Sequence, residues 1–350
     1  MKEITKQESM ADQVRKRVST TRTKRPELEG NIETMVSTGS TLLDLAISGG
    51  RVRGGGLPGG ISVEISGLPG TGKTVLLCET AGAIKRLGGE VMFHDPEARL
   101  NKQFASIFGM DVDELEYMTP NTVSEMFLAL RKWMPDNGKL NGVFTDSLAA
   151  LSTDMEMDND EGDKMGGRRA KELSEGFRKT ARLITSTNTL MVVSNQLREN
   201  MDRAFKFSPK YRTPGGQSIG YYTSLRLSSS KVGSLSRERK IKGKTHKIIY
   251  GIEVEVEVIK SSIWHPHRTA PVTIDFAYGI DNIRDSLRYL RDINGTKGYM
   301  LNGNLLDPTL PKAIEIVENE NLEGVLREEV IDTWEEIEAA FKVERKPKKR

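Results

Sequence analysis

The hydrophobic and polar positions of the chain follow two different periods, and these periods predict strands and helices in alternation. Four short apolar runs predict buried strands, at residues 61–66, 90–94, 142–145 and 189–194. Three longer segments repeat apolar residues at helical spacing, at residues 75–87, 122–134 and 170–187. Thr122 and Glu125 have the spacing of a capping box. This order predicts an α/β fold with a mostly parallel twisted sheet flanked by helices.

The pattern changes after Leu225. Residues 248–259 alternate between apolar and polar side chains, which is typical of a half-buried strand, and residues 271–276 predict another strand. We expect both to add an antiparallel edge to the parallel core. Residues 283–350 look helical and predict a small C-terminal region with a basic tail.

Three parts are therefore expected along the chain. Residues 1–35 predict a helix followed by a polar linker, residues 36–282 form the core, and residues 283–350 form the C-terminal region. Within the core, the glycine-rich stretch Gly54–Gly60 can only be a loop by its composition.

Composition narrows the class of protein. Of the 350 residues, 37% are hydrophobic and 29% are charged, which supports a real core and a soluble surface. No apolar run reaches the length of a membrane span, and the basic N-terminus does not resemble a secretory signal. The single cysteine, Cys78, excludes an intramolecular disulfide and a cysteine-rich zinc site. We therefore expect a cytoplasmic protein that does not associate with a membrane.

Charge distribution is more informative than the net charge of +3. Basic residues gather at both ends of the chain, within residues 15–25 and 345–350. Solvated tails and polyanion contacts are equally compatible with such runs.

The strongest chemical signal lies between the first predicted strand and the first predicted helix. A phosphate-binding P-loop is predicted there, formed by Gly67, Leu68, Pro69, Gly70, Thr71, Gly72, Lys73 and Thr74. Its glycines allow backbone N–H groups to turn toward phosphate oxygens, and the helix N-terminus favours negative charge. We expect Lys73 to reach the β- and γ-phosphates of a nucleoside triphosphate and the Thr74 hydroxyl to bind Mg²⁺.

Three polar positions at the ends of later strands are candidates for the same site. Asp146 fits a carboxylate that holds Mg²⁺ through water, although a capping Asp is the plain alternative. Glu97 can orient and deprotonate an attacking water; Asp95 is its rival, and either can be an ordinary loop acid. Gln196 can sense the γ-phosphate by hydrogen bonding, which is a weak signal when taken alone. The carboxyl ends of parallel strands face one crevice, so we expect these side chains to converge.

Two long segments without apolar periodicity are candidate DNA-binding loops, at residues 152–169 and 197–216. The first contributes the candidate residues Lys164, Met165, Gly166, Arg168 and Arg169. The second contributes the candidate residues Arg198, Met201, Arg203, Phe205, Lys206, Phe207, Lys210, Tyr211 and Arg212. Cations interleaved with aromatic residues suit single-stranded nucleic acid, since charges follow phosphates and rings stack on bases. A mobile, solvated loop is the alternative.

Together these motifs resemble the bacterial and phage RecA-like recombinases over roughly residues 36–280. The matching segments are Ser37–Asp44, the P-loop, Asp95–Glu97, Thr145–Ala150, Gly162–Gly166, Ser194–Arg198 and Pro214–Gly216, in the order and at the spacing typical of the family. The resemblance implies a RecA-type P-loop ATPase core with antiparallel edge strands, an N-terminal helix that docks on a neighbouring subunit and a small C-terminal helical region.

The resemblance also implies roles for single residues. Glu97 matches the catalytic glutamate and Gln196 the γ-phosphate sensor, with Lys73 completing the catalytic set. Met165 and Met201 fall where the family inserts apolar side chains between base triplets. Lys260 matches a lysine that reaches ATP across the subunit interface. Ser262 stands where the family often has a second interface lysine, so that Lys260 or a nearby cation such as Arg268 has to serve instead.

The implied function is a DNA-dependent ATPase and homologous recombinase. It forms helical filaments on single-stranded DNA with ATP at subunit interfaces, pairs the strand with homologous double-stranded DNA and exchanges strands, as in DNA recombination and repair. Single-strand-binding or loader proteins are further candidate partners. A ring-forming helicase on the same core and a regulatory ATP-binding paralogue remain the alternatives. The extra glycine-rich insert and the basic C-terminus favour a divergent, phage-encoded member over a typical bacterial one.

Overall fold

A computed structural model describes residues 34–133, 135, 137–158, 166–199, 211–212 and 217–342. The predicted N-terminal helix and the basic C-terminal run lie outside these residues. So do eight of the DNA-binding candidates, namely Lys164, Met165, Met201, Arg203, Phe205, Lys206, Phe207 and Lys210.

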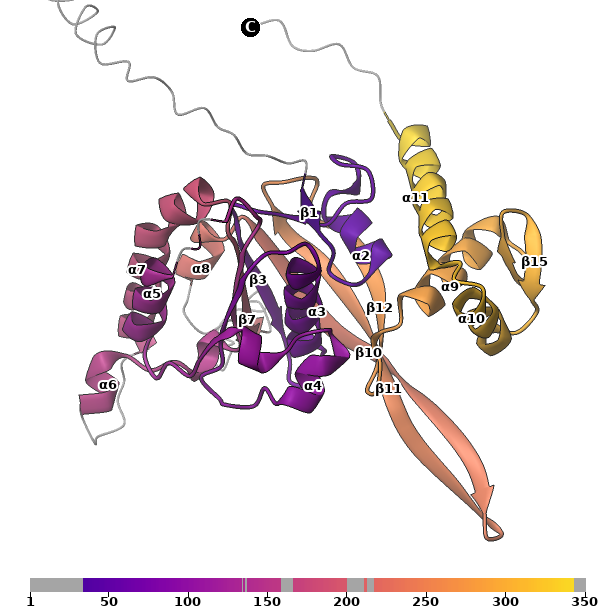
Figure 1. Ribbon diagram of the computed structural model, residues 1–350, viewed down its shortest axis with the longest axis horizontal. Helices are drawn as coiled ribbons and strands as arrows, with labels where there is room; N and C mark the ends of the chain where they lie inside the picture. Colours follow the sequence, from indigo (N-terminus) through magenta and orange to yellow (C-terminus); the bar gives the residue numbers. More distant parts are fainter. Residues whose placement is uncertain are drawn as a thin grey trace, which may run out of the picture.

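A mixed sheet of nine strands organises the described residues (Figure 1). Its strands are β3 (Ser62–Gly67), β4 (Val91–His94), β5 (Glu116–Met118), β6 (Gly142–Thr145), β7 (Leu190–Gln196), β10 (Leu225–Ile241), β11 (Lys244–Ser261), β12 (Thr269–Asp275) and β13 (Gly279–Ile280). Their order across the sheet is β13-β12-β11-β10-β3-β7-β6-β4-β5. The six strands from β10 to β5 pair in parallel, whereas β11, β12 and β13 pair antiparallel. The predicted parallel core with an antiparallel edge is therefore confirmed.

Helices cover both faces of the parallel strands. On one face lie α3 (Lys73–Arg86) and α4 (Lys102–Ile107); on the other lie α5 (Val123–Lys132), α7 (Gly166–Ser186) and α8 (Gln217–Tyr222). Strand β7 shows the division, because Leu190 and Val192 belong to the first apolar cluster while Met191 and Val193 belong to the second. A parallel strand buried on both faces is expected to be apolar throughout.

The predicted capping box is present at the start of α5. Thr122 accepts a hydrogen bond from the Glu125 backbone N–H, and the Glu125 side chain accepts from Thr122 N–H in return. The stripe of Val123, Met126 and Leu130 then packs into the second cluster.

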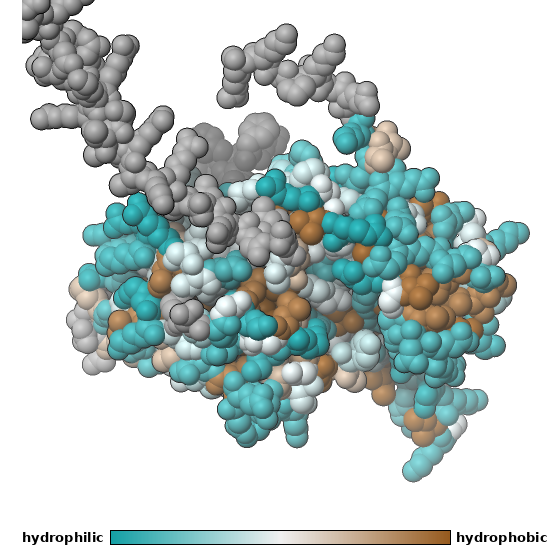
Figure 2. All heavy atoms as spheres, turned by 45° about the horizontal axis from the view of Figure 1, so that its top comes forward, coloured by the Kyte–Doolittle hydropathy of each residue, from teal (hydrophilic) through white to brown (hydrophobic). Residues whose placement is uncertain are grey.

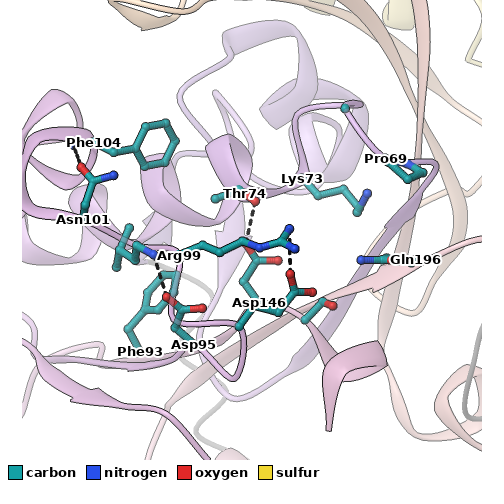
Figure 3. Close-up of a pocket in the computed structure, with 14 residues that line it drawn as sticks. Pro69, Lys73, Thr74, Phe93, Asp95, Arg99, Asn101, Phe104, Asp146 and Gln196 are labelled. Carbon is teal, nitrogen blue, oxygen red and sulfur yellow. Dashed lines mark hydrogen bonds and ion pairs between the residues drawn. The ribbon is translucent and has the colours of Figure 1, made fainter.

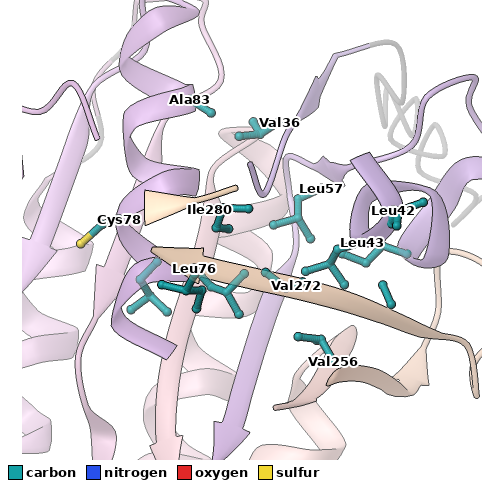
Figure 4. Close-up of a cluster of buried hydrophobic side chains, with 14 of the residues drawn as sticks. Val36, Leu42, Leu43, Leu57, Leu76, Cys78, Ala83, Val256, Val272 and Ile280 are labelled. Carbon is teal, nitrogen blue, oxygen red and sulfur yellow. The ribbon is translucent and has the colours of Figure 1, made fainter. Parts of the chain in front are cut away.

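The first cluster extends under the C-terminal part of the core. Figure 4 shows Leu76 of α3 close to Val272 and Ile280 of the antiparallel edge. The short helix α2 (Thr41–Asp44) adds Leu43 to the same cluster and continues into the π-helical turn η1 (Leu45–Gly49). The antiparallel strands thus pack against the P-loop helix α3 in one shared apolar core.

The glycine-rich insert is more ordered than predicted. Its residues Leu57–Pro58 form strand β2, which pairs with β1 (Met35–Val36). Gly55 has φ +64°, and a Cβ there would overlap the carbonyl oxygen of Asp44. The prediction of a pure loop was wrong because the glycines serve close backbone packing, which composition alone does not distinguish from a free turn.

The two candidate DNA-binding loops also contain more structure than predicted. Helix α6 (Asp154–Asp158) occupies part of the first, and α7 begins at Gly166 rather than at Ala170. The second is closed at its base by two short antiparallel strands, β8 (Arg198–Glu199) and β9 (Tyr211–Arg212). These short segments have no hydrophobic periodicity, so the sequence pattern did not predict their helices and strands.

Strands β10 and β11 form a hairpin that outgrows the sheet. Neighbouring strand β12 pairs with β11 only from Gly251 to Glu257. Residues 236–249 therefore continue as a two-stranded ribbon without a neighbouring strand among the described residues, and Figure 1 shows it projecting at the bottom of the molecule. We refer to residues 236–249 as the ribbon.

The C-terminal region contains helices α9 (Asn282–Asn294), α10 (Leu310–Asn319) and α11 (Glu323–Ala340). It also contains an antiparallel pair, β14 (Tyr299–Leu301) and β15 (Asn304–Asp307). The prediction of a helical region was therefore incomplete. Asn302 and Gly303, with φ of 49° and 75°, form the turn between these strands. An Asn-Gly pair between two short apolar runs is a strong hairpin signal that the helical prediction overlooked.

Remaining short elements connect the core strands. They are the 3-10 turns η2 (Val112–Glu114) and η3 (Leu148–Ala150).

Candidate nucleotide-binding site

The P-loop connects the buried strand β3 to the N-terminus of α3, as its sequence context predicts. Gly72 has φ +78°, and a Cβ there would overlap Ile274 Cδ1 of β12. At Gly67, a Cβ would lie 2.5 Å from Thr71 Oγ1 and 2.6 Å from Ser229 O. Both positions therefore require glycine for local packing, before any contribution to phosphate binding.

Lys73 lies in the first turn of α3 and is largely buried. Its Nζ donates hydrogen bonds to Gly67 O at 3.1 Å and Leu68 O at 2.8 Å. Burial lowers the pKa of the Lys73 ammonium, while the charges of Asp146 and Glu97 oppose that change. The ammonium is thus held over its own loop by two backbone carbonyls, within the electrostatic influence of two carboxylates.

Asp146 follows β6 and joins the P-loop to β7. Thr74 Oγ1 donates to Asp146 Oδ2 at 2.6 Å, and Ser194 Oγ donates to Asp146 Oδ1. The two hydrogen bonds fix the carboxylate beside the Thr74 hydroxyl. Mg²⁺ prefers oxygen ligands and is usually held by one or two protein groups together with substrate phosphates and water, so this pair fits it. No cluster of three or more His, Cys, Asp or Glu residues suited to a metal ion occurs in the described part of the chain.

The structure distinguishes Glu97 from its rival Asp95. Asp95 is buried, and its Oδ2 accepts hydrogen bonds from Leu100 N–H at 2.7 Å and from the Tyr117 hydroxyl at 2.9 Å. Burial, followed by the hydrogen bond to Asp95, raises the pKa of Tyr117 to about 12. Asp95 therefore shapes the turn after β4. Glu97 makes one ion pair, with the exposed Arg99 at 2.7 Å, and lines the pocket.

Gln196 and Asn195 point to opposite faces of β7. Gln196 lines the pocket, and its strand position pairs with Gly67, the first glycine of the P-loop. Asn195 faces the other side, where its Nδ2 donates to the buried Glu64 at 2.9 Å. Glu64 in turn accepts from Arg226 Nε at 2.5 Å. The strand end that precedes the second candidate DNA-binding loop is therefore fixed on both faces.

A pocket of about 400 Å³ unites these groups (Figure 3). Lys73, Thr74, Glu97, Asp146 and Gln196 all line it, so the structure brings the predicted nucleotide-site residues together. The pattern missed other lining residues, namely Phe93, Arg99, Leu100, Asn101, Phe104 and Ser147. It also missed Ser194. The two-residue period of β7 places Ser194 on the same face as Gln196, which is a usable signal for it.

Lys260 lies away from this pocket in the single chain. Its Nζ donates to the carbonyls of Gly220 and Thr223, both at 2.7 Å, at the C-terminal end of α8. Burial, together with the nearby charge of Arg226, lowers its pKa. Arg268, the other cation considered for the interface, is held by Glu338 of α11 at 2.6 and 2.8 Å and stacks over Trp334.

Few of the predicted DNA-binding side chains are placed. Arg168 and Arg169 lie in the first turn of α7. Arg168 pairs with Glu172 of the same helix at 3.3 Å, and Arg169 pairs with Glu156 of α6 at 3.2 Å. Gly166 is the first residue of that helix. Arg198, Tyr211 and Arg212 are placed by their backbone, in β8 and β9. Across the residues that the structure covers, no helix is long and apolar enough to span a membrane.

A P-loop between a buried parallel strand and a helix, with a Thr–Asp pair and a carboxylate in one pocket, defines a P-loop nucleotide-binding α/β protein. A family model described as the RecA N-terminal domain matches residues 12–281. Protein RecA of Phytoplasma mali (strain AT) is 32% identical over 264 residues, which cover 75% of this chain and 74% of that relative. The chain belongs to the RecA family.

Proposed function

We propose that this protein is a DNA-dependent ATPase and homologous recombinase that forms filaments on single-stranded DNA and exchanges strands with a homologous duplex. Membership of the RecA family supports a RecA-type recombinase or ATPase in general. The observation that carries the finer proposal is the convergence of Lys73, Thr74, Asp146, Glu97 and Gln196 on one pocket.

In the proposed reaction, ATP lies against the backbone of residues 67–74 with its phosphates near Lys73. Bound Mg²⁺ would neutralise phosphate charge, and Thr74 and Asp146 would hold it. Glu97 orients the attacking water and accepts its proton, since its one ion-pair partner among the described residues is the exposed Arg99. Asp95 is unsuited to that role because both of its partners hold it in the turn after β4.

Coupling to DNA runs through β7 in this proposal. Gln196 faces the nucleotide pocket, while Asn195 is bonded to the Glu64–Arg226 pair on the opposite face. A shift of Gln196 on binding or loss of the γ-phosphate would therefore move the end of β7, where residues 197–216 begin. We assign DNA contacts to this loop and to residues 152–169.

We also propose that ATP lies at subunit interfaces. Residues 1–35 would dock on a neighbouring subunit, residues 36–282 would form the ATPase core and residues 283–350 a smaller C-terminal region. Lys260 remains the proposed interface lysine. To reach a neighbour's nucleotide, its ammonium has to leave the carbonyls of Gly220 and Thr223. We propose a cytoplasmic location.

Filament formation is tested by electron microscopy of the protein with ATP and single-stranded DNA, alongside ATPase measurements. Continuous helical filaments and ATP hydrolysis stimulated by single-stranded DNA are expected. Closed hexameric rings would favour a helicase, and filaments with negligible hydrolysis would favour a regulatory paralogue; either outcome contradicts the proposal.

A further inference from the structure

The ribbon concentrates positive charge far from the nucleotide pocket. It contains one acidic residue, Glu238, and six basic residues: Arg237, Arg239, Lys240, Lys242, Lys244 and Lys247. Its net charge is therefore +5, whereas the whole chain carries +3, so the remainder of the chain sums to −2. Every residue of the ribbon is exposed. Figure 2 shows the projecting ribbon at the lower right as a mainly hydrophilic arm.

Strand register sorts these charges onto two faces. Residues directly opposite one another share a face, as do alternate residues of one strand. Arg239 lies opposite His246 and Ile241 opposite Lys244, so Arg237, Arg239, Lys244 and His246 share a face without an acidic residue. On the other face Glu238 lies opposite Lys247, with their charged atoms 3.7 Å apart.

The first face carries three cations, Arg237, Arg239 and Lys244, together with the exposed Ile241 and Ile248. Among the described residues, the ion pairs of the ribbon are limited to Glu238 with Lys247. Arg237 stacks over the Tyr250 ring at 4.0 Å, which keeps its charge and braces the ribbon where it leaves the sheet. Side chains on one face of a strand recur about every 7 Å, so the face offers cations at the interval of a phosphate chain.

The tip itself adds a cation at a conformational cost. Lys242 and Gly243 form the turn, with φ of 50° and 79°. A left-handed conformation costs a lysine about 1 kcal/mol or more, and Asn or Asp would adopt it more easily.

We propose that the ribbon is a sequence-independent contact for the phosphate backbone of double-stranded DNA. Apart from the imidazole of His246, the ribbon has no aromatic ring on which an unpaired base could stack, and Arg237 covers the ring of the adjacent Tyr250. Sites for single strands combine cations with several aromatic rings. A two-stranded ribbon also has the width that a DNA major groove admits. The inference rests on the proposed function only in taking DNA as the polyanion.

The test measures binding of a short labelled duplex of arbitrary sequence to the full chain without ATP, over a range of salt concentrations. The variant Arg237→Gln/Arg239→Gln/Lys244→Gln is compared with Lys132→Gln/Lys139→Gln/Lys312→Gln, which removes equal charge from exposed positions elsewhere. Each lost phosphate contact lowers the salt slope by about 0.9, so the ribbon variant should lose about 2 to 3 units of slope and about tenfold or more in duplex affinity. The control should keep both.

Three outcomes would overturn the proposal. They are equal behaviour of the two triple variants, an equal loss of affinity for single-stranded DNA, and loss of duplex binding in Ile248→Ser/Ile249→Ser but not in the charge variant. The last would make the ribbon an apolar contact for another macromolecule. Hydrolysis stimulated by single-stranded DNA should persist in the ribbon variant. If the wild-type protein shows no hydrolysis stimulated by single-stranded DNA, that result would instead count against the proposed function.

Discussion

The nucleotide pocket and the ribbon handle charge in opposite ways. In the pocket, the oxygens of Asp146 and Asp95 accept hydrogen bonds from helix α3, from strands β5 and β7 and from the turn after β4. On the ribbon, Arg239, Lys240, Lys242 and Lys244 have no ion-pair partner among the described residues. Buried charge is tolerable only when it is partnered, whereas exposed charge needs no partner and acts over a longer range. Activity at the pocket should therefore depend on the replacement of single atoms, whereas binding by the ribbon should depend only on its total charge.

The largest effect is expected from Glu97→Gln, because the amide cannot accept a proton from water. DNA-stimulated ATP hydrolysis should fall by about 100- to 10,000-fold. Nucleotide binding, measured with a fluorescent ATP analogue, should be retained. Arg99→Ala, which removes only the exposed partner of Glu97, serves as the control and should remain active. Turnover by the Glu97→Gln variant at the wild-type rate would refute the catalytic assignment.

Packing around the P-loop is probed by Gly72→Ala against Gly70→Ala. Both glycines have positive φ, at 78° and 72°, but a Cβ at Gly70 meets no atom within 4 Å, whereas one at Gly72 overlaps Ile274. Left-handed strain costs about 1–2 kcal/mol at either position, and overpacking adds about 1–3 kcal/mol at Gly72 alone. Urea unfolding without nucleotide should rank Gly72→Ala as the less stable. Equal losses would show that the loop relaxes away from β12.

Buried Asp44 offers a test by pH. It accepts hydrogen bonds from Ser37 Oγ, Thr38 N–H and Thr38 Oγ1, yet burial raises its pKa to about 6 from 3.8. The folded state thus binds the proton more tightly than the unfolded state, so this residue's contribution to stability falls as pH rises from about 4 to about 6 and is constant above.

Asp44→Asn removes that titration while keeping the Thr38 hydrogen bonds. The stability of wild type minus that of the variant should therefore fall by about 1 kcal/mol per pH unit between pH 4 and 6. The control Asp111→Asn alters an exposed carboxylate, and its difference from wild type should not follow this profile. A flat difference for Asp44→Asn would contradict the raised pKa.

The smallest effect is expected on the ribbon, from Glu238→Gln. An exposed ion pair at 3.7 Å contributes less than about 1 kcal/mol, so unfolding should shift by no more than a few tenths. Duplex affinity should rise slightly because the ribbon's net charge increases by one. A large loss of stability would show that the ribbon, like the pocket, depends on individual contacts.

Sequence patterns predicted the parts of this fold that obey a simple period. The alternation of buried strands with helices, the capping box at Thr122 and Glu125 and the antiparallel edge were confirmed. Strand β10 was missed altogether, and its outer half leaves the sheet and has no buried face to impose an alternation. The same absence of period hid α6 and the early start of α7.

The residues of the candidate site also differ in how far local sequence spacing predicted them. Motif spacing was sufficient to gather Lys73, Thr74, Asp146 and Gln196. It left Glu97 and Asp95 as alternatives because both follow the same strand. The distinction came from Tyr117, which lies on the neighbouring strand β5 and binds Asp95. Such long-range partners depend on strand order, which local spacing does not encode.

A joint-molecule assay tests the central claim most directly. Purified protein, ATP, Mg²⁺ and a single strand are mixed with either homologous or heterologous duplex, and paired products are separated on a gel. The proposed recombinase should form joint molecules with the homologous duplex alone and only when nucleotide is present. Strand separation with either duplex, or no joint molecules under conditions where DNA stimulates hydrolysis, would contradict it.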